Sequence, residues 1–345
     1  MRKIRHFLLV LCVVALGSGW SSTVFAQTAI YLHTGRVTKA SPNENPMSKQ
    51  RIMARDRALA TQDSLDYNEA VAKAFLLLRK DSLSQAQHEL ERALRLRPKA
   101  ETNAVLRLNL AKIYYWRKQW HDADRTLREV REDFARQLAQ KGNVKTLLEA
   151  GTNGNLQSLL NETRTWHCNT LYQLGKYQLA ADSIQTFLQQ KPELSPHEEM
   201  DVCTLLGDCY FALKNYDAAV AAYKRTLKIE ANAFEALLPM VQALQAIHRE
   251  EEALMWLNSA LQYENYEEPL VARAKLHRAM ANEEAALADW EVLVKENPQN
   301  LQYQVARAEM LLAVGKKKKA KDAVKKLLHA GFPHRELPAQ LQEIK

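Results

Sequence analysis

The sequence predicts an all-α protein, an α-solenoid in which about seven helix pairs follow one another as a right-handed superhelix. Composition is the first reason, because the 345 residues include only ten glycines and ten prolines, and such a composition favours helices. Few stretches are rich in Val, Ile or Thr, so a large sheet is not expected. The second reason is an internal repeat of alanines and prolines.

That repeat is visible in three Ala–Pro pairs with one spacing, Ala86 with Pro98, Ala180 with Pro192 and Ala286 with Pro298. Aligning the chain on these alanines extends the series to Ala86, Ala123, Ala180, Ala219, Ala253, Ala286 and Ala320. The successive intervals are 37, 57, 39, 34, 33 and 34 residues. A recurrent 34-residue period is typical of stacked helix pairs, in which each pair buries its apolar face against its neighbours.

The best single unit covers residues 200–233. It places Cys203, Leu206, Gly207 and Tyr210 in its first half, and Ala219 and Tyr223 in its second half. This spacing resembles the W-x-x-L-G-x-x-Y and A-x-x-x-F patterns of the tetratricopeptide repeat family. The unit departs from the family at both ends, because Cys203 occupies the tryptophan position and Ala231 the closing proline position.

The resemblance covers roughly residues 67–334 in seven units, which start near Tyr67, Ala104, Asn161, Met200, Phe234, Glu267 and Leu301. Small residues, Gly207 among them, are expected where the two helices of a pair approach closely. Gly175 and Gly315 stand five residues before their alanines, where the turn between the helices needs a permissive residue.

The sequence therefore divides into a signal peptide (1–26), a flexible leader with the start of the first helix (27–62), units 1–2 (63–137), an insertion (138–160), units 3–7 (161–334) and a short C-terminal cap (335–345). The insertion contains Gly142, Gly151 and Gly154, and we expect it to interrupt the stack.

The first 26 residues have the composition of a Sec-type signal peptide. A basic start containing Arg2, Lys3 and Arg5 precedes an apolar run over Phe7–Leu16, and cleavage is expected between Ala26 and Gln27. The apolar run is about half of the ~20 residues that a spanning helix needs. No later segment has the length or purity to cross a bilayer, so the mature protein is expected to be periplasmic or secreted.

Charge alternates along the chain. Residues 27–197 hold 26 basic and 18 acidic side chains, residues 198–300 hold 9 and 18, and residues 301–345 hold 10 and 4. A nucleic-acid-binding protein usually keeps one sign along its contact face, so no nucleic-acid partner is expected. The pattern favours protein partners of mixed charge.

The resemblance also implies a binding site, because in this family the first helix of each pair lines a concave groove. The residues that correspond to groove positions are Phe75, Lys112, Tyr115, Trp116, Asn169, Tyr172, Asp208, Phe211, Gln242, Gln245, Lys275 and Arg278. Aromatic residues in such a groove anchor interfaces. The alternative for each aromatic residue is packing against the neighbouring repeat.

A run of lysines, Lys316, Lys317, Lys318 and Lys319, lies at the turn of the last unit. One interpretation is a docking patch for an acidic protein, a lipid headgroup or nucleic acid. The other, which the sequence favours, is a solvated turn that keeps the end of the array soluble.

Residues for chemistry are scarce. The chain has no Gly-rich phosphate loop, no G-x-S-x-G and no H-E-x-x-H. Of the three cysteines in the mature chain, Cys168, Cys203 and Cys209, the first two lie on first helices of adjacent units, so a bridge between them stays open, although buried thiols are favoured. We therefore expect no catalytic residue, no metal and no cofactor.

The expected function is that of a non-catalytic scaffold or adaptor in the cell envelope, which binds partner proteins or peptides in the groove. Two alternatives remain at this point. The chain is an accessory subunit that positions substrate for an envelope enzyme or for a secretion or assembly machine, or it binds a polyanion or surface through the lysine-rich last unit. The sequence leaves the partner's identity and the oligomeric state undetermined.

Overall fold

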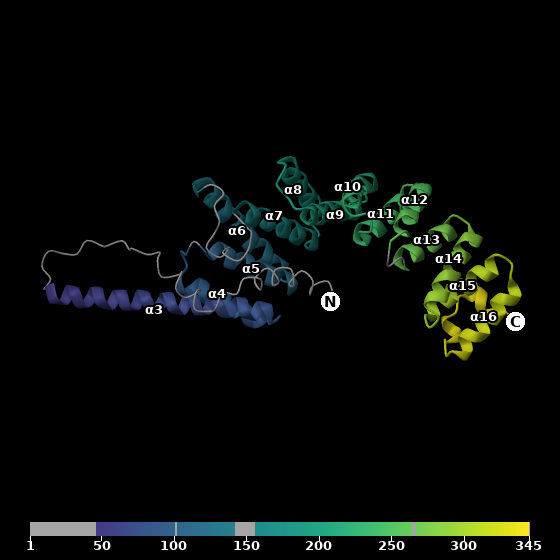
Figure 1. Cartoon of the computed structure of the whole chain (residues 1–345), viewed down its shortest axis with the longest axis horizontal. Coiled ribbons are helices and arrows are strands. Elements are labelled where there is room, and N and C mark those ends of the chain that lie inside the picture. The colour runs from purple at the N-terminus through teal and green to yellow at the C-terminus, as the bar shows by residue number, and fades with distance from the viewer. Residues whose placement is uncertain (1–45, 101, 142–155, 264–266, 345) are drawn as a thin grey trace. The chain divides into compact units, whose positions relative to one another are not determined.

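The computed structural model describes residues 46–100, 102–141, 156–263 and 267–344, and within these ranges it contains helices and no strands (Figure 1). The predicted all-α class is thereby confirmed. The expected signal peptide, most of the expected leader and the three glycines of the expected insertion lie outside the described residues.

The described chain forms two compact units, with the boundary between Lys176 and Tyr177. The first unit contains α3 (Pro46–Arg79), α4 (Leu83–Leu96), α5 (Asn103–Trp116), α6 (Trp120–Lys141) and α7 (Leu156–Gln173). The second contains α8 (Tyr177–Gln189), α9 (Pro196–Ala212), α10 (Tyr216–Ile229), α11 (Phe234–Ala246), α12 (Glu250–Ala260), α13 (Glu267–Ala279), α14 (Glu283–Glu296), α15 (Leu301–Ala313), α16 (Lys317–His329), the 3₁₀ turn η4 (His334–Glu336) and α17 (Ala339–Gln342).

The predicted register is visible in the turns between first and second helices. All seven alignment alanines are fully buried. The residue five positions before each of them has a positive φ, and these residues are Asp81, Lys118, Gly175, Lys214, His248, Ala281 and Gly315. At each turn the next backbone N–H donates to a carbonyl five residues earlier, over 2.8–3.0 Å. This hydrogen bond defines a Schellman motif, so seven first helices end in the same way.

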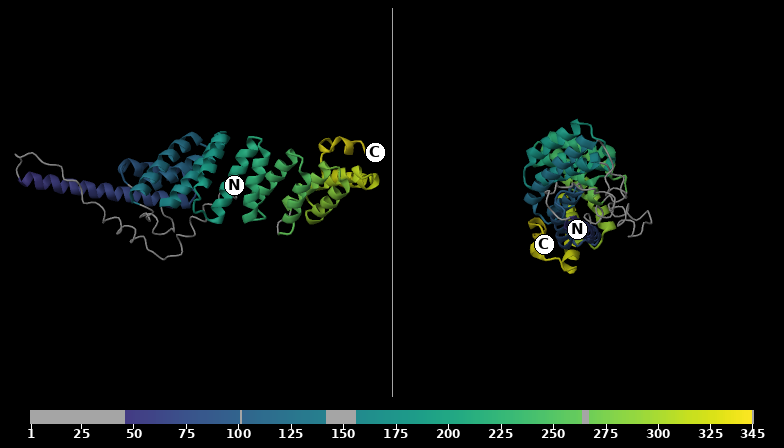
Figure 2. Two further views of the ribbon diagram at one scale, coloured as in Figure 1. Left: turned by 90° about the horizontal axis from the view of Figure 1, so that it is seen from above. Right: turned by 90° about the vertical axis from the view of Figure 1, so that its left-hand side faces the viewer.

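The first unit buries its apolar side chains in two clusters. One joins α3, α4 and α5 around Leu90 and Ile113. The other joins α5, α6 and α7 around Leu127 and Phe134. Helix α3 is 34 residues long and extends well past the 14-residue α4 (Figure 2). It begins at Pro46, within the range 27–62 that the sequence analysis assigns to the leader and the start of the first helix.

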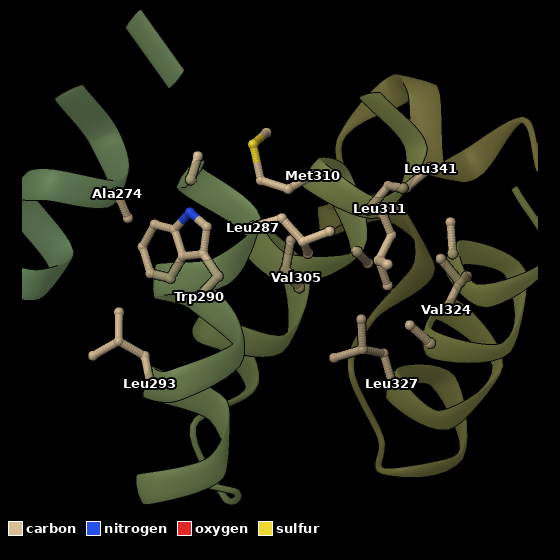
Figure 3. Packing of buried hydrophobic residues seen from close by; sticks show 14 of the residues in the cluster. Ala274, Leu287, Trp290, Leu293, Val305, Met310, Leu311, Val324, Leu327 and Leu341 are labelled. Atoms are coloured by element: carbon tan, nitrogen blue, oxygen red, sulfur yellow. The ribbon is translucent and has the colours of Figure 1, made fainter. Parts of the chain in front are cut away.

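The second unit is packed pair upon pair. One cluster joins α10–α13 around Tyr223 and Met240, and another joins α13–α17. Figure 3 shows Trp290 between Ala274 and the side chains of α15, with Leu311 facing Leu327. Leu337 and Leu341 are buried in the same cluster, so the residues after α16 cover the apolar side of the last pair.

Local capping fixes where several helices begin. Ser195 caps α9 through a capping box, in which its hydroxyl accepts from the Glu198 N–H and the Glu198 carboxylate accepts from the Ser195 N–H. Asn215 and Asn300 cap α10 and α15 with their side-chain oxygens. Among the helices that the structure describes, none has the length and apolar composition needed to cross a membrane.

Candidate functional site

First helices of neighbouring pairs contact one another within each unit. Helix α5 contacts α7 in the first unit, and α11 contacts both α9 and α13 in the second. Their outward side chains therefore form one surface in each unit, which we call the first-helix face. All twelve predicted groove residues lie on first helices, namely α3, α5, α7, α9, α11 and α13.

An aromatic cluster forms the first-helix face of the first unit. Tyr115 and Trp116 on α5 both meet Trp166 on α7 edge to face, with ring centroids 5.3 and 5.8 Å apart. All three side chains are half-buried. Tyr115 also hydrogen-bonds the Gln173 side chain, and burial raises the pKa of its phenol. The cluster contains two of the predicted residues and one, Trp166, that the sequence analysis did not select.

Lys112 lies beneath this cluster and is only 4% exposed. Its ammonium pairs with the Glu162 carboxylate of α7, and it lies 5.8 Å from the centroid of the Trp166 ring. Lys112 thus joins two repeats and is not open on the face, so we leave it out of the proposed binding residues.

The other predicted residues of the first unit are partly covered. Phe75 is half-buried against the apolar cluster of α3, α4 and α5. Asn169 donates through its side-chain amide to the Thr165 carbonyl over 3.0 Å, and Tyr172 is half-buried.

In the second unit, Asp208 is tied to the packing of its own pair. The Tyr223 hydroxyl donates to Asp208 Oδ1 over 2.7 Å, and burial raises the pKa of Asp208 against the effect of this hydrogen bond. Phe211 meets Tyr216 edge to face, with ring centroids 5.5 Å apart. Asp208 and Phe211 are both half-buried, and each keeps part of its side chain exposed on the first-helix face.

Farther along the second unit the predicted residues are more open. Gln242 and Lys275 are exposed and Gln245 is half-buried. Arg278 donates to both carboxylate oxygens of Glu309, over 2.9 and 3.4 Å. Arg278 therefore pairs across neighbouring repeats, whereas the two glutamines and Lys275 remain available as polar contacts.

Acidic residues accompany the predicted ones on α9 and α11. Burial raises the pKa of Asp201; Glu198 and Glu235 act in the same direction, while His197 opposes them. The His197 imidazole Nδ1 lies 3.3 Å from Asp201 Oδ2. The first-helix face of the second unit thus carries carboxylates where the first unit carries aromatic rings.

A buried Asp124–His167 pair was not selected from the sequence. His167 Nε2 lies 2.9 Å from Asp124 Oδ1, and both side chains are less than 10% exposed. Burial would raise the pKa of Asp124, but His167, Arg128 and Lys176 outweigh burial and lower it. Burial lowers the pKa of His167, and the nearby Arg131 and Arg128 act in the same direction against Asp124. The neutral imidazole therefore donates from Nε2 to the ionised carboxylate.

The lowered pKa of His167 predicts a pH dependence of stability. Above about pH 6.5 the histidine is neutral in both folded and unfolded chains, so its contribution to the free energy of unfolding is fully present. Below that pH the unfolded chain binds the proton first, so the free energy of unfolding falls as pH falls toward the folded-state pKa. The lowered pKa of Asp124 acts only at lower pH, below about 3.9.

We expect the urea midpoint to decrease from pH 7.5 to pH 5, and the His167→Gln variant to show a flatter profile. The slope for one histidine is limited to about 1.4 kcal/mol per pH unit. His121→Gln, on the exposed side of α6, is the matched control and keeps the native slope. Circular dichroism at each pH measures this, and an unchanged slope in His167→Gln contradicts the assignment.

The three cysteines that the structure describes, Cys168, Cys203 and Cys209, are buried and form no disulfide with one another. Burial raises the pKa of the Cys168 thiol to about 12 and also raises that of Cys203. The expectation of buried thiols is confirmed. Within the part of the chain that the structure describes, no group of three or more His, Cys, Asp or Glu side chains is placed to hold a metal ion.

The comparison with known families agrees with the repeat register. A family model described as tetratricopeptide repeat matches residues 106–136 and 205–233. The first segment covers most of α5 and α6, and the second covers the end of α9 and all of α10. These are the second and fourth of the seven units. No curated protein matches the sequence.

Several solved structures are similar to this chain at low sequence identity. The C-terminal part of a tetratricopeptide repeat-containing protein from Cytophaga hutchinsonii is 15% identical, with a TM-score of 0.57 over 75% of this chain and 94% of that chain. The apo form of RapI is 13% identical, with a TM-score of 0.51 over 80% and 79%. A tetratricopeptide repeat protein from Parabacteroides merdae is 20% identical, with a TM-score of 0.48 over 81% and 98%.

Proposed function

Since this chain belongs to the tetratricopeptide repeat family, we propose that it is a non-catalytic scaffold of the cell envelope that binds protein segments along its first-helix faces. Folds of this kind serve many tasks, so the function depends on the side chains that the first-helix faces carry. Rigid stacked helices present side chains that are already ordered, which lowers the entropy cost of binding.

One observation carries the proposal, the aromatic cluster of Tyr115, Trp116 and Trp166. Edge-to-face contacts fix the three rings relative to one another, yet each ring keeps part of its surface exposed. Aromatic side chains held in this way bury a large area on binding at low entropy cost and are enriched among residues that dominate binding energy. The partner segment expected here contributes an apolar or aromatic side chain.

The second unit favours a partner of different chemistry. Asp201 and Asp208 are half-buried carboxylates, and Glu235 stands near Asp201 on the next first helix. Burial raises the pKa values of both aspartates, so a cationic group brought beside them would stabilise their charged forms. Segments with lysine or arginine are therefore the expected partners of this face.

The envelope location rests on the sequence alone. The basic and apolar segments of residues 1–26 have the order that a Sec signal peptide requires, and they lie outside the described residues.

Site-specific photocrosslinking in the native cell tests the function. A benzophenone amino acid replaces Trp116 in one variant and Glu129 in the other. Glu129 is an exposed residue of α6 in the same unit, so the two variants differ in the face that they probe. We expect a discrete protein adduct in the envelope fraction from position 116, and none from position 129.

The Trp166→Ala change in the position-116 variant serves as a second test. It removes one wall of the aromatic cluster, so the adduct is expected to weaken while circular dichroism shows the helix content retained. Equal adducts from both positions contradict binding at the first-helix face. An adduct found only in the cytoplasmic fraction contradicts the envelope location and leaves the face assignment standing.

A further inference from the structure

Helix α16 exposes an arc of lysines on the last repeat. Lys316 stands directly before the helix, and six further lysines lie within it, namely Lys317, Lys318, Lys319, Lys321, Lys325 and Lys326. All seven lysines are exposed except Lys321, which is half-buried. The surface of α16 is therefore strongly basic, with Asp322 as its one acidic side chain.

None of these seven lysines forms an ion pair with any residue that the structure describes. Other lysines of the chain do so, for example Lys73 with Glu89 and Lys224 with Glu252. The seven charges thus remain unneutralised within residues 267–344, where α16 contacts α15 and α17.

The position of these lysines does not serve the fold. Positive charge in the first turn of a helix opposes the helix dipole. Helices α9, α12, α13 and α14 instead carry glutamates in their first turns. Since Lys317–Lys319 lie in the first turn of α16, they weaken the helix rather than stabilise it.

The apolar side of α16 is already occupied. Ala320, Ala323, Val324 and Leu327 are buried, and Figure 3 shows Val324 and Leu327 in the cluster that includes Leu311 and Leu341. The helix therefore has no free apolar face to insert into a membrane or a partner's groove. Whatever binds α16 is held by charge at its surface.

We propose that α16 is an electrostatic docking surface for a bilayer that contains anionic phospholipid. Clusters of lysines are attracted to such surfaces because each charge adds a similar increment of binding energy. The ammonium is a point charge on a flexible stem, which suits laterally mobile headgroups better than carboxylates fixed on a protein. Among the exposed residues of α16 there is no arginine, phenylalanine, tyrosine or tryptophan, so the arginine forks and large rings that commonly read or stack on nucleic-acid bases are missing from this helix.

Vesicle flotation tests this surface with the protein as exported and purified from cells, so that the predicted signal peptide does not contribute. One set of vesicles contains equal parts of phosphatidylglycerol and phosphatidylcholine, and the other contains phosphatidylcholine alone. We expect binding to the anionic vesicles only, and its loss at high salt because the interaction is screened.

The variant with Lys316–Lys319 changed to Gln is expected to bind the anionic vesicles at least roughly tenfold more weakly. Its helix content and melting temperature are expected to equal or exceed the native values, because the four charges oppose the helix dipole. The control changes four exposed lysines dispersed over other repeats to Gln, namely Lys80, Lys99, Lys228 and Lys295. It has the same net charge as the test variant and is expected to bind as the native protein does.

Several outcomes overturn the proposal. These are no binding to anionic vesicles, equal weakening in the control variant, and binding that persists at high salt. Retention of duplex DNA by the native protein without vesicle binding also overturns it and identifies a different polyanion. The proposal is independent of the first-helix faces, so Trp116 crosslinks can succeed whatever the vesicles show.

Discussion

Replacing Gly207 with alanine is expected to destabilise the second unit by about 2 kcal/mol, although alanine is the better helix former. A Cβ atom at Gly207 would lie 2.4 and 2.5 Å from two ring carbons of Tyr223. Overpacking of this kind costs about 3 kcal/mol, and the higher helix propensity of alanine returns about 1 kcal/mol. Urea unfolding followed by circular dichroism measures the difference.

The Tyr223 ring has no simple way to relieve this contact. It is fully buried, and its hydroxyl donates to Asp208 Oδ1, so a shift of the ring also disturbs that hydrogen bond. Because Asp208 lies on the first-helix face, Gly207→Ala is expected to alter the face as well as the core.

A second background distinguishes steric clash from other causes. In a Tyr223→Leu variant the ring is absent, and Gly207→Ala is then expected to be neutral or stabilising by up to about 1 kcal/mol. This reversal of sign is the signature of the contact. If Gly207→Ala costs the same in both backgrounds, the close approach of α9 and α10 at this point is not its cause.

The helix pairs were predictable from the sequence because their signals are local. An alanine at a fixed place in each unit is needed wherever two helices approach closely, and the same spacing locates the turn five residues earlier. The sequence marked only Gly175 and Gly315 as turn residues, yet Lys118, His248 and Ala281 adopt positive φ at equivalent places. The position in the repeat, rather than the residue type, is the reliable signal for these turns.

The composition of the binding face was less predictable, because it depends on how neighbouring helices cross. The repeat template selected Asn169 and Tyr172 on α7, whereas Trp166 of the same helix contacts Tyr115 and Trp116. It also selected Lys112 as a groove residue, and the structure pairs this lysine with Glu162. The charge of a lysine says nothing about a carboxylate that stands 50 residues later in the chain, so its burial had no sequence signal.

The Asp124–His167 pair shows the same limit. Asp124 follows the alignment alanine Ala123, and His167 precedes Cys168, which occupies a core position. In the sequence, each of the two is an ordinary polar residue at the edge of a buried helix face. Their meeting depends on the packing of α6 against α7. Internal periodicity therefore predicts which side of a helix is buried, but not which polar groups find partners there.

Replacing Glu162 with glutamine is expected to destabilise the first unit by about 3 kcal/mol, the largest single effect that we predict. The change is isosteric, but it leaves the ammonium of Lys112 buried without an opposite charge. Removing one partner of a buried ion pair typically costs about 3–5 kcal/mol. Glutamine keeps an acceptor oxygen and Glu162 itself is 29% exposed, so the lower end of that range is expected. Urea unfolding followed by tryptophan fluorescence measures it.

A matched control and a double variant test whether the unpaired ammonium of Lys112 is the cause of the lost stability. Arg125→Gln removes an exposed partner of Asp122, in a pair whose side chains are 67% and 41% exposed, and it is expected to cost less than about 1 kcal/mol. Lys112→Met combined with Glu162→Gln removes both charges while keeping the volume of the lysine stem, and it is expected to recover most of the loss. If the double variant is as unstable as Glu162→Gln alone, an unpaired ammonium is not the reason. In that case the carboxylate itself, rather than its pairing with Lys112, holds α5 and α7 together.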